Sequence, residues 1–346
     1  MLLTALRRPM LFVGGKGGVG KTSLASALAL SRARSGERVL VVSTDPAHNL
    51  GHLWRQDVGD RPVRLAAHGA GVLDGVEIDP HATIERHLAA VQETMLTMLP
   101  ERQHAAARAH LERARNAPGS HESAVLQRIA DLAEVGRRDY DAVIFDTAPS
   151  GHTLRLLALP GQLAGWTETL LRNRDRSERY SAAMRGLTGR AEAGVEAQAD
   201  LRRALQGRRD RFDALQQAIN DPQRTGFAVV FTAEALPVAE TLEVVSGLRD
   251  LHVPVAALIA NRRSPADSGD LLRARRATEE HHLQRVREQV PDVPMIEVPL
   301  VAGELTGLQA LEALAVLVES AQSRPAGGGS PSADTGGLRR TMGPKH

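Results

Sequence analysis

The chain of 346 residues contains no cysteine. Disulfide bonds, thiolate-bound zinc and cysteine-held iron–sulfur clusters are therefore excluded, and so are the functions that depend on them. This composition suits the cytoplasm, where we expect the protein to act. No stretch reaches the roughly 18 apolar residues that a membrane span needs, and residues 1–9 do not resemble a signal peptide. We therefore expect any contact with a membrane to be peripheral.

Lysine is almost as scarce as cysteine. The 43 basic residues include only three lysines, Lys16, Lys21 and Lys345, and the remainder are arginine. Two of the three lie within residues 15–22. A compact ammonium differs from a planar guanidinium fork, so this stretch requires lysine where the rest of the chain takes arginine. The formal net charge is only +2, with acidic residues throughout, so charge does not indicate a nucleic-acid partner.

The lysine-bearing stretch reads Gly-Lys-Gly-Gly-Val-Gly-Lys-Thr and fits the phosphate-binding pattern G-x-x-x-x-G-K-[ST]. The apolar run 10–13 before it predicts a buried strand, and the Ala- and Leu-rich run 23–34 after it predicts a helix. Glycines let backbone N–H groups approach phosphates, and the helix N-terminus adds partial positive charge. A glycine-rich turn without this role would need neither the lysines nor the threonine. The predicted ATP-binding residues here are Gly15, Lys16, Gly17, Gly18, Val19, Gly20, Lys21, Thr22 and Ser23.

The residue types in this loop also predict individual roles. Lys21 would contact the β- and γ-phosphates, and the Thr22 hydroxyl would hold Mg²⁺. A second apolar run, 140–146, ends in Asp146, and an aspartate in that place supports Mg²⁺ or its water in phosphate-loop ATPases. The small residues of 147–153 favour a mobile loop that can sense the γ-phosphate.

Strands and helices are predicted to alternate along nearly the whole chain. This pattern predicts an α/β fold with a doubly wound, mostly parallel sheet, in which polar residues after the strands bind the ligand. Further strands are expected at 38–44, 75–79, 227–231, 253–260 and 293–298, and helices at 237–251, 267–290 and 305–320. We predict one ATPase domain over residues 1–322 with a helical subdomain formed by 82–135 and 163–219. Residues 323–346, rich in Gly, Pro and Ser, are expected to be a disordered tail.

The first helical segment carries one apolar stripe. Its members recur at spacings of three and four residues: Ile84, Leu88, Val91, Met95 and Met98. The simpler interpretation is that the stripe packs against the main domain. The alternative is a methionine-bearing groove for an apolar client, because methionine adapts to irregular partners.

Several longer motifs resemble the ArsA family of phosphate-loop ATPases. Lys16, directly after the first glycine of the pattern, makes this the deviant Walker A form. Residues 45–49 read Asp-Pro-Ala-His-Asn, and residues 146–155 read Asp-Thr-Ala-Pro-Ser-Gly-His-Thr-Leu-Arg. The resemblance continues through residues 236–241, Asn261 and residues 299–304, and ends near residue 311. The family includes the ATPase of arsenite efflux pumps and the ATPase that targets tail-anchored membrane proteins.

The resemblance implies an ATPase that uses Mg²⁺ and works as a nucleotide-switched homodimer. Lys16 would reach across the dimer interface to the partner's nucleotide and act in catalysis with Lys21. Asp45 would orient the attacking water and share the Mg²⁺ site with Thr22 and Asp146. The adenine would be flanked by Asn261 and Pro299. The switch residues would be Pro46, His48 and Asn49 in the first loop and Thr147, Pro149, Gly151 and His152 in the second.

Three functions are left open, in this order of preference. The first is a homodimer that binds and releases apolar, tail-anchored membrane-protein segments; the second is the ATPase subunit of an arsenite or anion efflux transporter. Pump ATPases of the family have two phosphate loops and bind arsenite through cysteines, whereas this chain has one loop and no cysteine. Against the first function, residues 163–219 are poorer in apolar residues than the client region of the targeting ATPase. The third is a MinD- or ParA-like positioning or regulatory ATPase, although the tail lacks an amphipathic membrane helix.

Overall fold

The computed structural model describes residues 5–45, 49–79, 81–86, 89, 92, 104–105, 108–109, 120–147, 157–158, 195–267 and 269–323. The side chains of residues 120–121, 195–202, 204–205 and 208 lie outside this description. The described part contains an eight-stranded sheet in the order β3-β4-β2-β5-β1-β6-β7-β8. Every neighbouring pair is parallel except β3 and β4. The predicted α/β fold with a mostly parallel sheet is confirmed.

The strands follow the apolar runs of the sequence. They are β1 (Met10–Gly15), β2 (Arg38–Ser43), β3 (Val63–His68), β4 (Gly71–Glu77), β5 (Ala142–Asp146), β6 (Thr225–Thr232), β7 (Val255–Arg263) and β8 (Met295–Pro299). The six central strands were predicted within a few residues. The edge strand β3 was not, because its first two residues are exposed and it has no continuous apolar run. It pairs antiparallel with β4 and forms one edge of the sheet.

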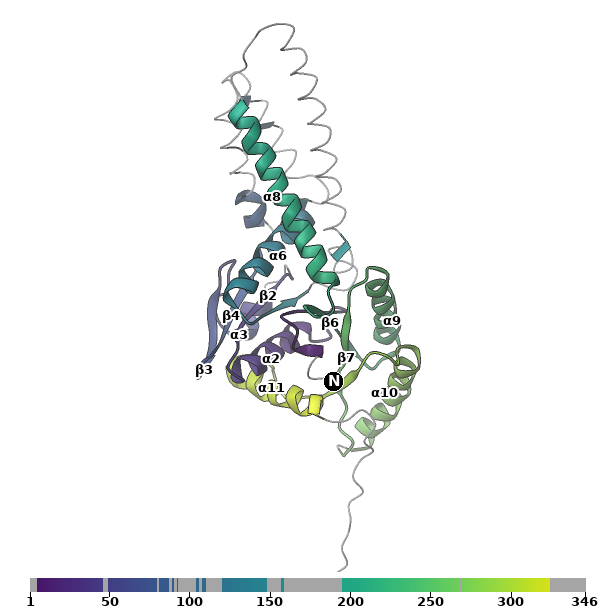
Figure 1. The fold of residues 1–346 in the computed structure, drawn as a ribbon. Helices are drawn as coiled ribbons and strands as arrows, with labels where there is room; N and C mark the ends of the chain where they lie inside the picture. The colour runs from purple at the N-terminus through teal and green to yellow at the C-terminus, as the bar shows by residue number, and fades with distance from the viewer. Residues whose placement is uncertain are drawn as a thin grey trace, which may run out of the picture.

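Helices cover both faces of the sheet (Figure 1). They are α2 (Lys21–Arg34), α3 (Asn49–Trp54), α6 (Ser120–Asp139), α8 (Val195–Asn220), α9 (Ala235–Asp250), α10 (Gly269–Gln289) and α11 (Leu308–Ser323). Side chains of α2, α3 and α11 share one buried cluster, and those of α6, α8, α9 and α10 share the other. Alternation along β1 shows the division, since Phe12 belongs to one cluster and Leu11 to the other.

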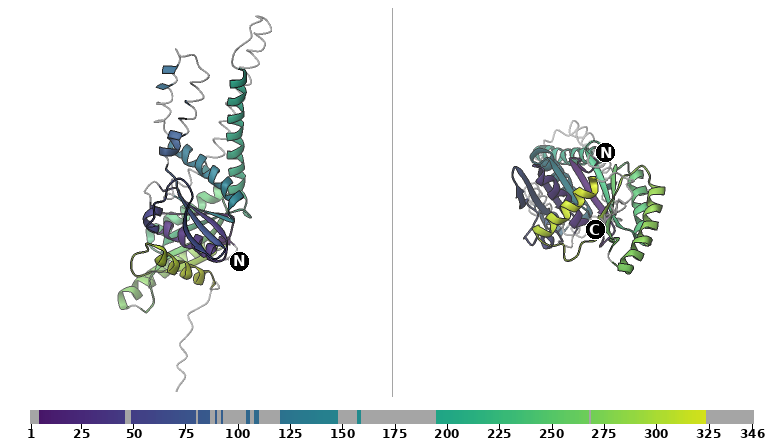
Figure 2. Two further views of the ribbon diagram at one scale, coloured as in Figure 1. Left: turned by 90° about the vertical axis from the view of Figure 1, so that its left-hand side faces the viewer. Right: turned by 90° about the horizontal axis from the view of Figure 1, so that it is seen from below.

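Helix α8 extends well beyond the sheet (Figure 2). Its C-terminal part packs into the core through Phe212, Leu215 and Ile219, just before β6 begins. A helix of 26 residues is about 39 Å long, so its N-terminal half projects past the carboxyl ends of the parallel strands. Helix α8 overlaps the predicted segment 163–219 and ends one residue past it, whereas α6 overlaps the segment 82–135 but continues four residues past its predicted end. Ile84 of the apolar stripe is buried, whereas Leu88, Val91, Met95 and Met98 lie outside the described residues.

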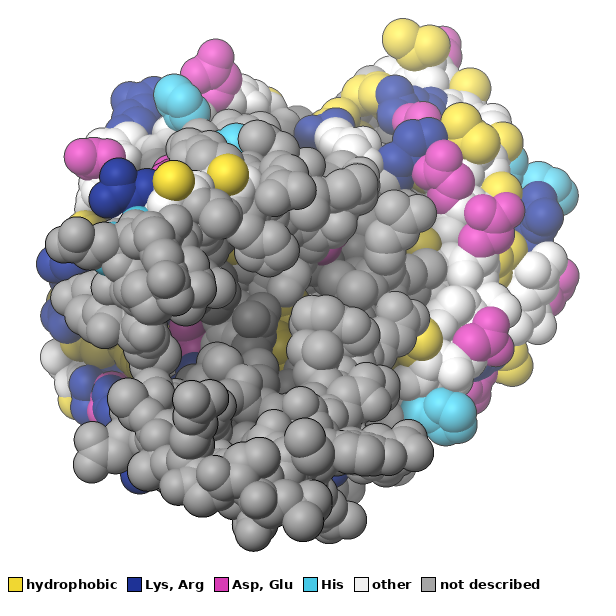
Figure 3. Space-filling model, turned by 90° about the horizontal axis from the view of Figure 1, so that it is seen from above, with side chains coloured by type: hydrophobic (Ala, Val, Ile, Leu, Met, Phe, Trp, Pro, Cys, Tyr) yellow, Lys and Arg dark blue, Asp and Glu magenta, His cyan; other side chains and the backbone are white. Residues whose placement is uncertain are grey.

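The division into one domain and a tail stays a prediction, because residues 324–346 lie outside the described part of the chain. On the opposite side of the sheet from β3, α9 and α10 carry charges of both signs. Figure 3 shows these positive and negative side chains interleaved on the right of the molecule. Many of them form ion pairs, and one group of these pairs is considered below.

Candidate nucleotide site

The predicted site residues lie at one edge of the sheet, where the parallel strands end. Central strand β1 runs into the phosphate loop, and its neighbours β5 and β6 lie on either side. The chain therefore leaves β1 at a topological switch point, which is where doubly wound sheets bind ligands. The remaining predicted residues come from the ends of neighbouring strands: Asp45 after β2, Asp146 at the end of β5, Asn261 in β7 and Pro299 at the end of β8.

The phosphate loop has a backbone that only glycine tolerates at two places. Gly15 has φ 146°, and a Cβ there would lie 2.1 Å from the carbonyl oxygen of Val230. Gly20 has φ 93°, and a Cβ there would lie 2.5 Å from Nδ2 of Asn261. Gly20 is also the N-cap of α2 and provides no side chain to cap it. The first N–H groups of α2 therefore lack a side-chain acceptor from the cap and are available to an anion.

Lys21 is a buried cation at the start of α2, with a relative exposure of 7%. Its Nζ donates a hydrogen bond of 3.0 Å to the carbonyl oxygen of Lys16, so the side chain folds back over the loop. Burial lowers the pKa of Lys21, while the negative charges of Asp146 and Asp45 oppose that effect. A phosphate in the loop would supply the anionic partner that a desolvated ammonium needs.

Asp146 is fully buried at the end of β5. Neither of its carboxylate oxygens has a hydrogen-bond partner among the described residues. Burial raises its pKa to about 7, the hydroxyl of Thr22 and the charge of Lys21 act in the opposite direction, and the charges of Asp45 and Glu77 raise it further. A buried carboxylate with so few donors among the described residues is costly, and a bound cation would offset that cost.

The residues around Asp146 fit a magnesium ion. Mg²⁺ takes one or two carboxylates together with water and phosphate oxygens, rather than a full protein cage. Consistent with this, the described residues contain no group of three or more His, Asp or Glu side chains that could hold a metal alone. Thr22 and Asp146 are the side chains that would hold the ion here, and the predicted share of Asp45 in the site stays a prediction.

The ends of β2 and β5 are fixed to one another and to β1. The Thr44 hydroxyl donates to the carbonyl oxygen of Asp146 at 3.2 Å, and the Thr147 hydroxyl donates to that of Val13 at 3.0 Å. Asp45 accepts a hydrogen bond of 3.3 Å from Nδ2 of Asn49. The other predicted switch residues, Pro46, His48, Pro149, Gly151 and His152, lie outside the described residues, and their roles stay predictions.

The other lysine of the loop faces in a different direction. Nζ of Lys16 forms an ion pair of 2.9 Å with Oε1 of Glu240 in α9, and both side chains are about one-third exposed. The second oxygen of Glu240, Oε2, is buried and has no hydrogen-bond partner in the described part of the chain. Sequence reasoning identified residues 236–241 as a shared motif but did not assign Glu240 this contact. No local spacing could have shown it, since the two residues are 224 positions apart.

Asn261 joins the far side of the site to the phosphate loop. Its Nδ2 donates a buried hydrogen bond of 2.8 Å to the carbonyl oxygen of Val19. Pro299 lies at the end of the neighbouring strand, where it pairs with Arg263. Asn261 and Pro299, which are far apart in the sequence, thus lie on two adjacent strands, and their role at the adenine stays a prediction.

Comparison with known proteins agrees with this geometry. A family model described as anion-transporting ATPase matches residues 8–320. The chain belongs to the ArsA family of ATPases. The ATPase ARSA2 of Chlamydomonas reinhardtii is 32% identical over 317 residues, which cover 88% of this chain and 83% of that protein. The ATPase get3 of Sclerotinia sclerotiorum is 30% identical and covers 92% of both chains.

A longer relative matches over only part of its length. The putative arsenical pump-driving ATPase of Halobacterium salinarum is 33% identical over 310 residues, which are 87% of this chain but 43% of that protein. The chain therefore spans less than half of that relative. As a member of the ArsA family, the chain is an ATPase, and its family uses nucleotide. Among the described helices, none is both long and apolar enough to cross a membrane.

Proposed function

We propose that this ArsA-family protein hydrolyses ATP with Mg²⁺ as a nucleotide-switched homodimer that binds and releases apolar, tail-anchored segments of membrane proteins. The observation that carries the proposal is the division between its two lysines. Lys21 is buried over its own loop, whereas Lys16 is partly exposed and paired with Glu240. Lys16 is thus free to serve a second copy once that ion pair opens. We propose that the protein acts in the cytoplasm and meets membranes only peripherally.

In the proposed reaction, the chain positions the phosphates and neutralises the charge that develops on them. Lys21 and the loop N–H groups bind the β- and γ-phosphates, and Asn261 and Pro299 flank the adenine. Asp45 orients the attacking water. Mg²⁺, held through Thr22 and Asp146, would neutralise phosphate charge. Lys16 of the second copy would add a further positive charge.

A chain of hydrogen bonds supports coupling of the first switch to the helical segment. Glu77 accepts hydrogen bonds from the backbone N–H groups of Leu50 and Gly51 at the start of α3, directly after the switch residues. Two residues later, Asp79 accepts the N–H groups of residues 81 and 82, where the helical segment begins. A shift of the switch would therefore move the base of the segment that we propose to hold the client.

The test uses the Asp45→Asn protein, which is designed to retain ATP. It is mixed with a peptide that carries a C-terminal apolar helix and analysed by gel filtration with Mg-ATP or Mg-ADP. The expected result is a soluble complex of two protein copies with the peptide in ATP and its loss in ADP. A matched peptide with charged residues along the helix should not bind. Absence of a complex in every nucleotide state would refute client binding while leaving the ATPase activity to be measured separately.

One comparison favours a second candidate, the ATPase subunit of an anion efflux transporter. The relative from Halobacterium salinarum is named as an arsenical pump-driving ATPase. Because this chain has no cysteine, thiolate capture of arsenite is impossible. A rise in ATPase rate on addition of arsenite would support the transporter function, and an unchanged rate would count against it.

A further inference from the structure

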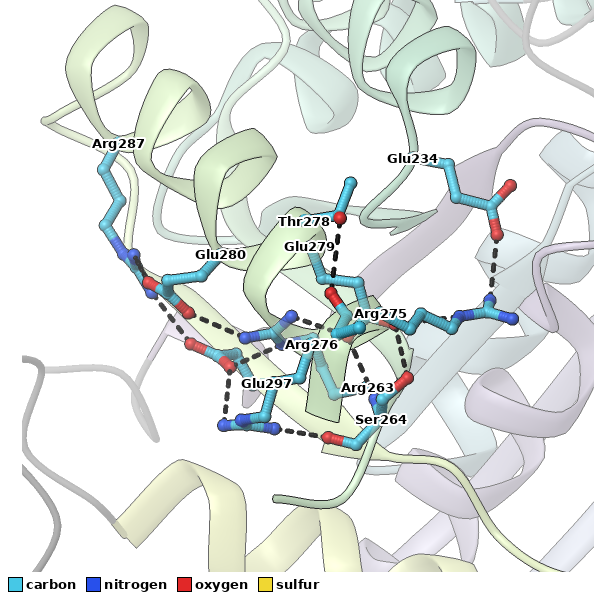
Figure 4. A network of polar contacts seen from close by, with 11 residues as sticks. Glu234, Arg263, Ser264, Arg275, Arg276, Thr278, Glu279, Glu280, Arg287 and Glu297 are labelled. Carbon is cyan, nitrogen blue, oxygen red and sulfur yellow. Dashed lines mark hydrogen bonds and ion pairs between the residues drawn. The ribbon is translucent and has the colours of Figure 1, made fainter. Parts of the chain in front are cut away.

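Arg263, the last residue of β7, is the buried centre of an ionic network whose outer members are partly exposed (Figure 4). Its side chain is only 2% exposed, yet its guanidinium forms three ion pairs of 2.7 Å, with Glu279 and Glu280 of α10 and Glu297 of β8. Additional arginines complete the network: Arg275, Arg276 and Arg287. Every nitrogen of the Arg263 guanidinium therefore has a carboxylate partner.

The network lies at an irregularity in the sheet. Ala260 pairs with Glu297 and Arg263 pairs with Pro299, so β7 advances three residues where β8 advances two. The extra residue makes a bulge, which re-aims side chains and is frequent near active sites. Arg262, within the bulge, has φ 57°, a left-handed conformation that is uncommon outside glycine.

The bulge sets the direction of Asn261. The Asn261 amide donates to the carbonyl of Val19 at 2.8 Å, and its oxygen accepts the N–H of Arg262 at 2.9 Å. Both contacts lie directly beside the left-handed residue Arg262. In a regular strand, residues two apart point to the same face of the sheet. Without the bulge, either Asn261 would turn away from the phosphate loop or Arg263 would turn away from α10.

The ion pairs hold the bulge from the other side. Because Glu297 is opposite Ala260, its pair with Arg263 spans the irregular segment from strand to strand. The carbonyl of Arg263 accepts the N–H of Leu300 at 2.9 Å, which fixes the chain just after Pro299. Ser264 donates its N–H and its hydroxyl to Glu279, at 3.0 and 2.7 Å. Residues 261–264 are thus anchored on the phosphate loop at one end and on α10 at the other.

The pKa of Glu279 is lowered, as its ion pair with Arg263 and its hydrogen bonds would require. Burial alone would raise the pKa of Glu279, but hydrogen bonds from Ser264 and Arg275 and the charge of Arg263 outweigh burial and lower it. A buried ion pair such as Arg263 with Glu279 contributes little net stability compared with apolar residues of the same volume. The contribution that we infer for this network is therefore one defined arrangement of the backbone around it.

We propose that Arg263, held by Glu279 and Glu297, is a positioning residue for nucleotide binding: it fixes the β7 bulge and so sets the relative placement of Asn261 and Pro299. The inference rests on the proposed role of these two residues at the adenine. It gives the network an effect on base affinity and base choice that acts through Asn261.

The experiment compares Glu297→Gln and Arg263→Lys with the wild type. Glu297→Gln removes one charge at a half-buried position and keeps the side chain's shape, and Arg263→Lys keeps a charge that cannot span three carboxylates. The control is Arg249→Gln, which breaks the exposed ion pair of 2.6 Å with Asp292 in the same half of the molecule. We expect KM for ATP to rise about tenfold in both test variants with kcat within about twofold, and preference for ATP over GTP to fall. The control should match the wild type.

A double-mutant cycle with Asn261→Ala separates positioning from general weakening. If Arg263 acts through Asn261, adding Glu297→Gln to Asn261→Ala raises KM no further. Unchanged KM and base preference in a folded Glu297→Gln protein would overturn the inference, as would fully additive effects in the cycle. If Arg263→Lys does not fold, Glu297→Gln alone decides. A wild-type protein that binds no ADP in calorimetry would instead refute the proposed function.

Discussion

Replacing Asp146 by asparagine is expected to stabilise the nucleotide-free protein while abolishing ATP hydrolysis. The carboxyl group is fully buried, and burial raises its pKa from the ordinary 3.8 to about 7. At 1.36 kcal/mol per pKa unit, keeping this group ionised costs the folded state about 4 kcal/mol. Asparagine has nearly the same shape and no charge, so the variant removes that cost.

The effect depends on pH in a defined direction. Because the pKa is higher in the folded than in the unfolded state, the folded protein binds more protons between about pH 4 and pH 7. The contribution of Asp146 to the free energy of unfolding therefore falls as pH rises through this window and is constant above it. Asp146→Asn should thus gain about 4 kcal/mol at pH 8 but only about 2 kcal/mol at pH 5.

Thermal unfolding at the two pH values tests this directly, with EDTA present to remove Mg²⁺. The midpoint of unfolding shifts by roughly 2 °C for each kcal/mol of added stability in a protein of this size. The midpoint of the variant should therefore lie about 8 °C above that of the wild type at pH 8, and about half as far above it at pH 5. Asp250→Asn, which changes an exposed carboxylate in α9, is the control and should shift the midpoint little. An Asp146→Asn protein no more stable than the wild type at pH 8 would show that the buried charge is compensated and refute the reasoning.

Three further changes test the site. Asp45→Asn should keep ATP affinity within about threefold and lose at least about a hundredfold in kcat, measured by calorimetry and phosphate release; near-normal turnover would remove its role with water. Gly15→Ala should lose measurable ADP binding, because the new methyl group would lie 2.1 Å from the carbonyl oxygen of Val230. The control is Gly36→Ala, since Gly36 also has a positive φ but a methyl group there would meet no neighbouring atom. Lys16→Arg should reduce kcat at least about tenfold despite its charge, and wild-type kcat in this variant would mean that the scarcity of lysine elsewhere is composition alone.

Much of the fold could be predicted because most of the central strands contain an uninterrupted apolar run. Burial on both faces leaves no polar alternation in β1, β2 or β5, and that property is visible without knowing which strands are neighbours. Strand β3 was missed for the converse reason, since its stability comes from pairing with β4 at the sheet edge. Helix α3, which starts at Asn49, was also missed because its N-terminus is stabilised by Glu77, a residue distant in sequence.

The site could be predicted in part for a similar reason. Residues of the phosphate loop are contiguous, so their spacing carries the information, and Asp146 and Asn261 lie at or near the carboxyl ends of parallel strands that end at the same edge. The ion pair of Lys16 with Glu240 and the network of Arg263 connect residues far apart in the chain. No periodicity marks such contacts, and only the strand order brings their members together.

The charges at this site are arranged for a partner that the chain does not contain. Lys21 is desolvated and bonded to a carbonyl of its own loop, and Asp146 is buried with the Thr22 hydroxyl and the charge of Lys21 only partly offsetting its burial. Each arrangement is unfavourable by itself, and each is relieved by one component of a magnesium nucleotide: the phosphates and the cation. Binding would therefore release strain that the fold maintains, and loss of the γ-phosphate would restore part of it. This difference between the two nucleotide states would drive the proposed switch, and the pairing of Lys16 with Glu240 at the surface is compatible with the proposed role of Lys16 in a second copy.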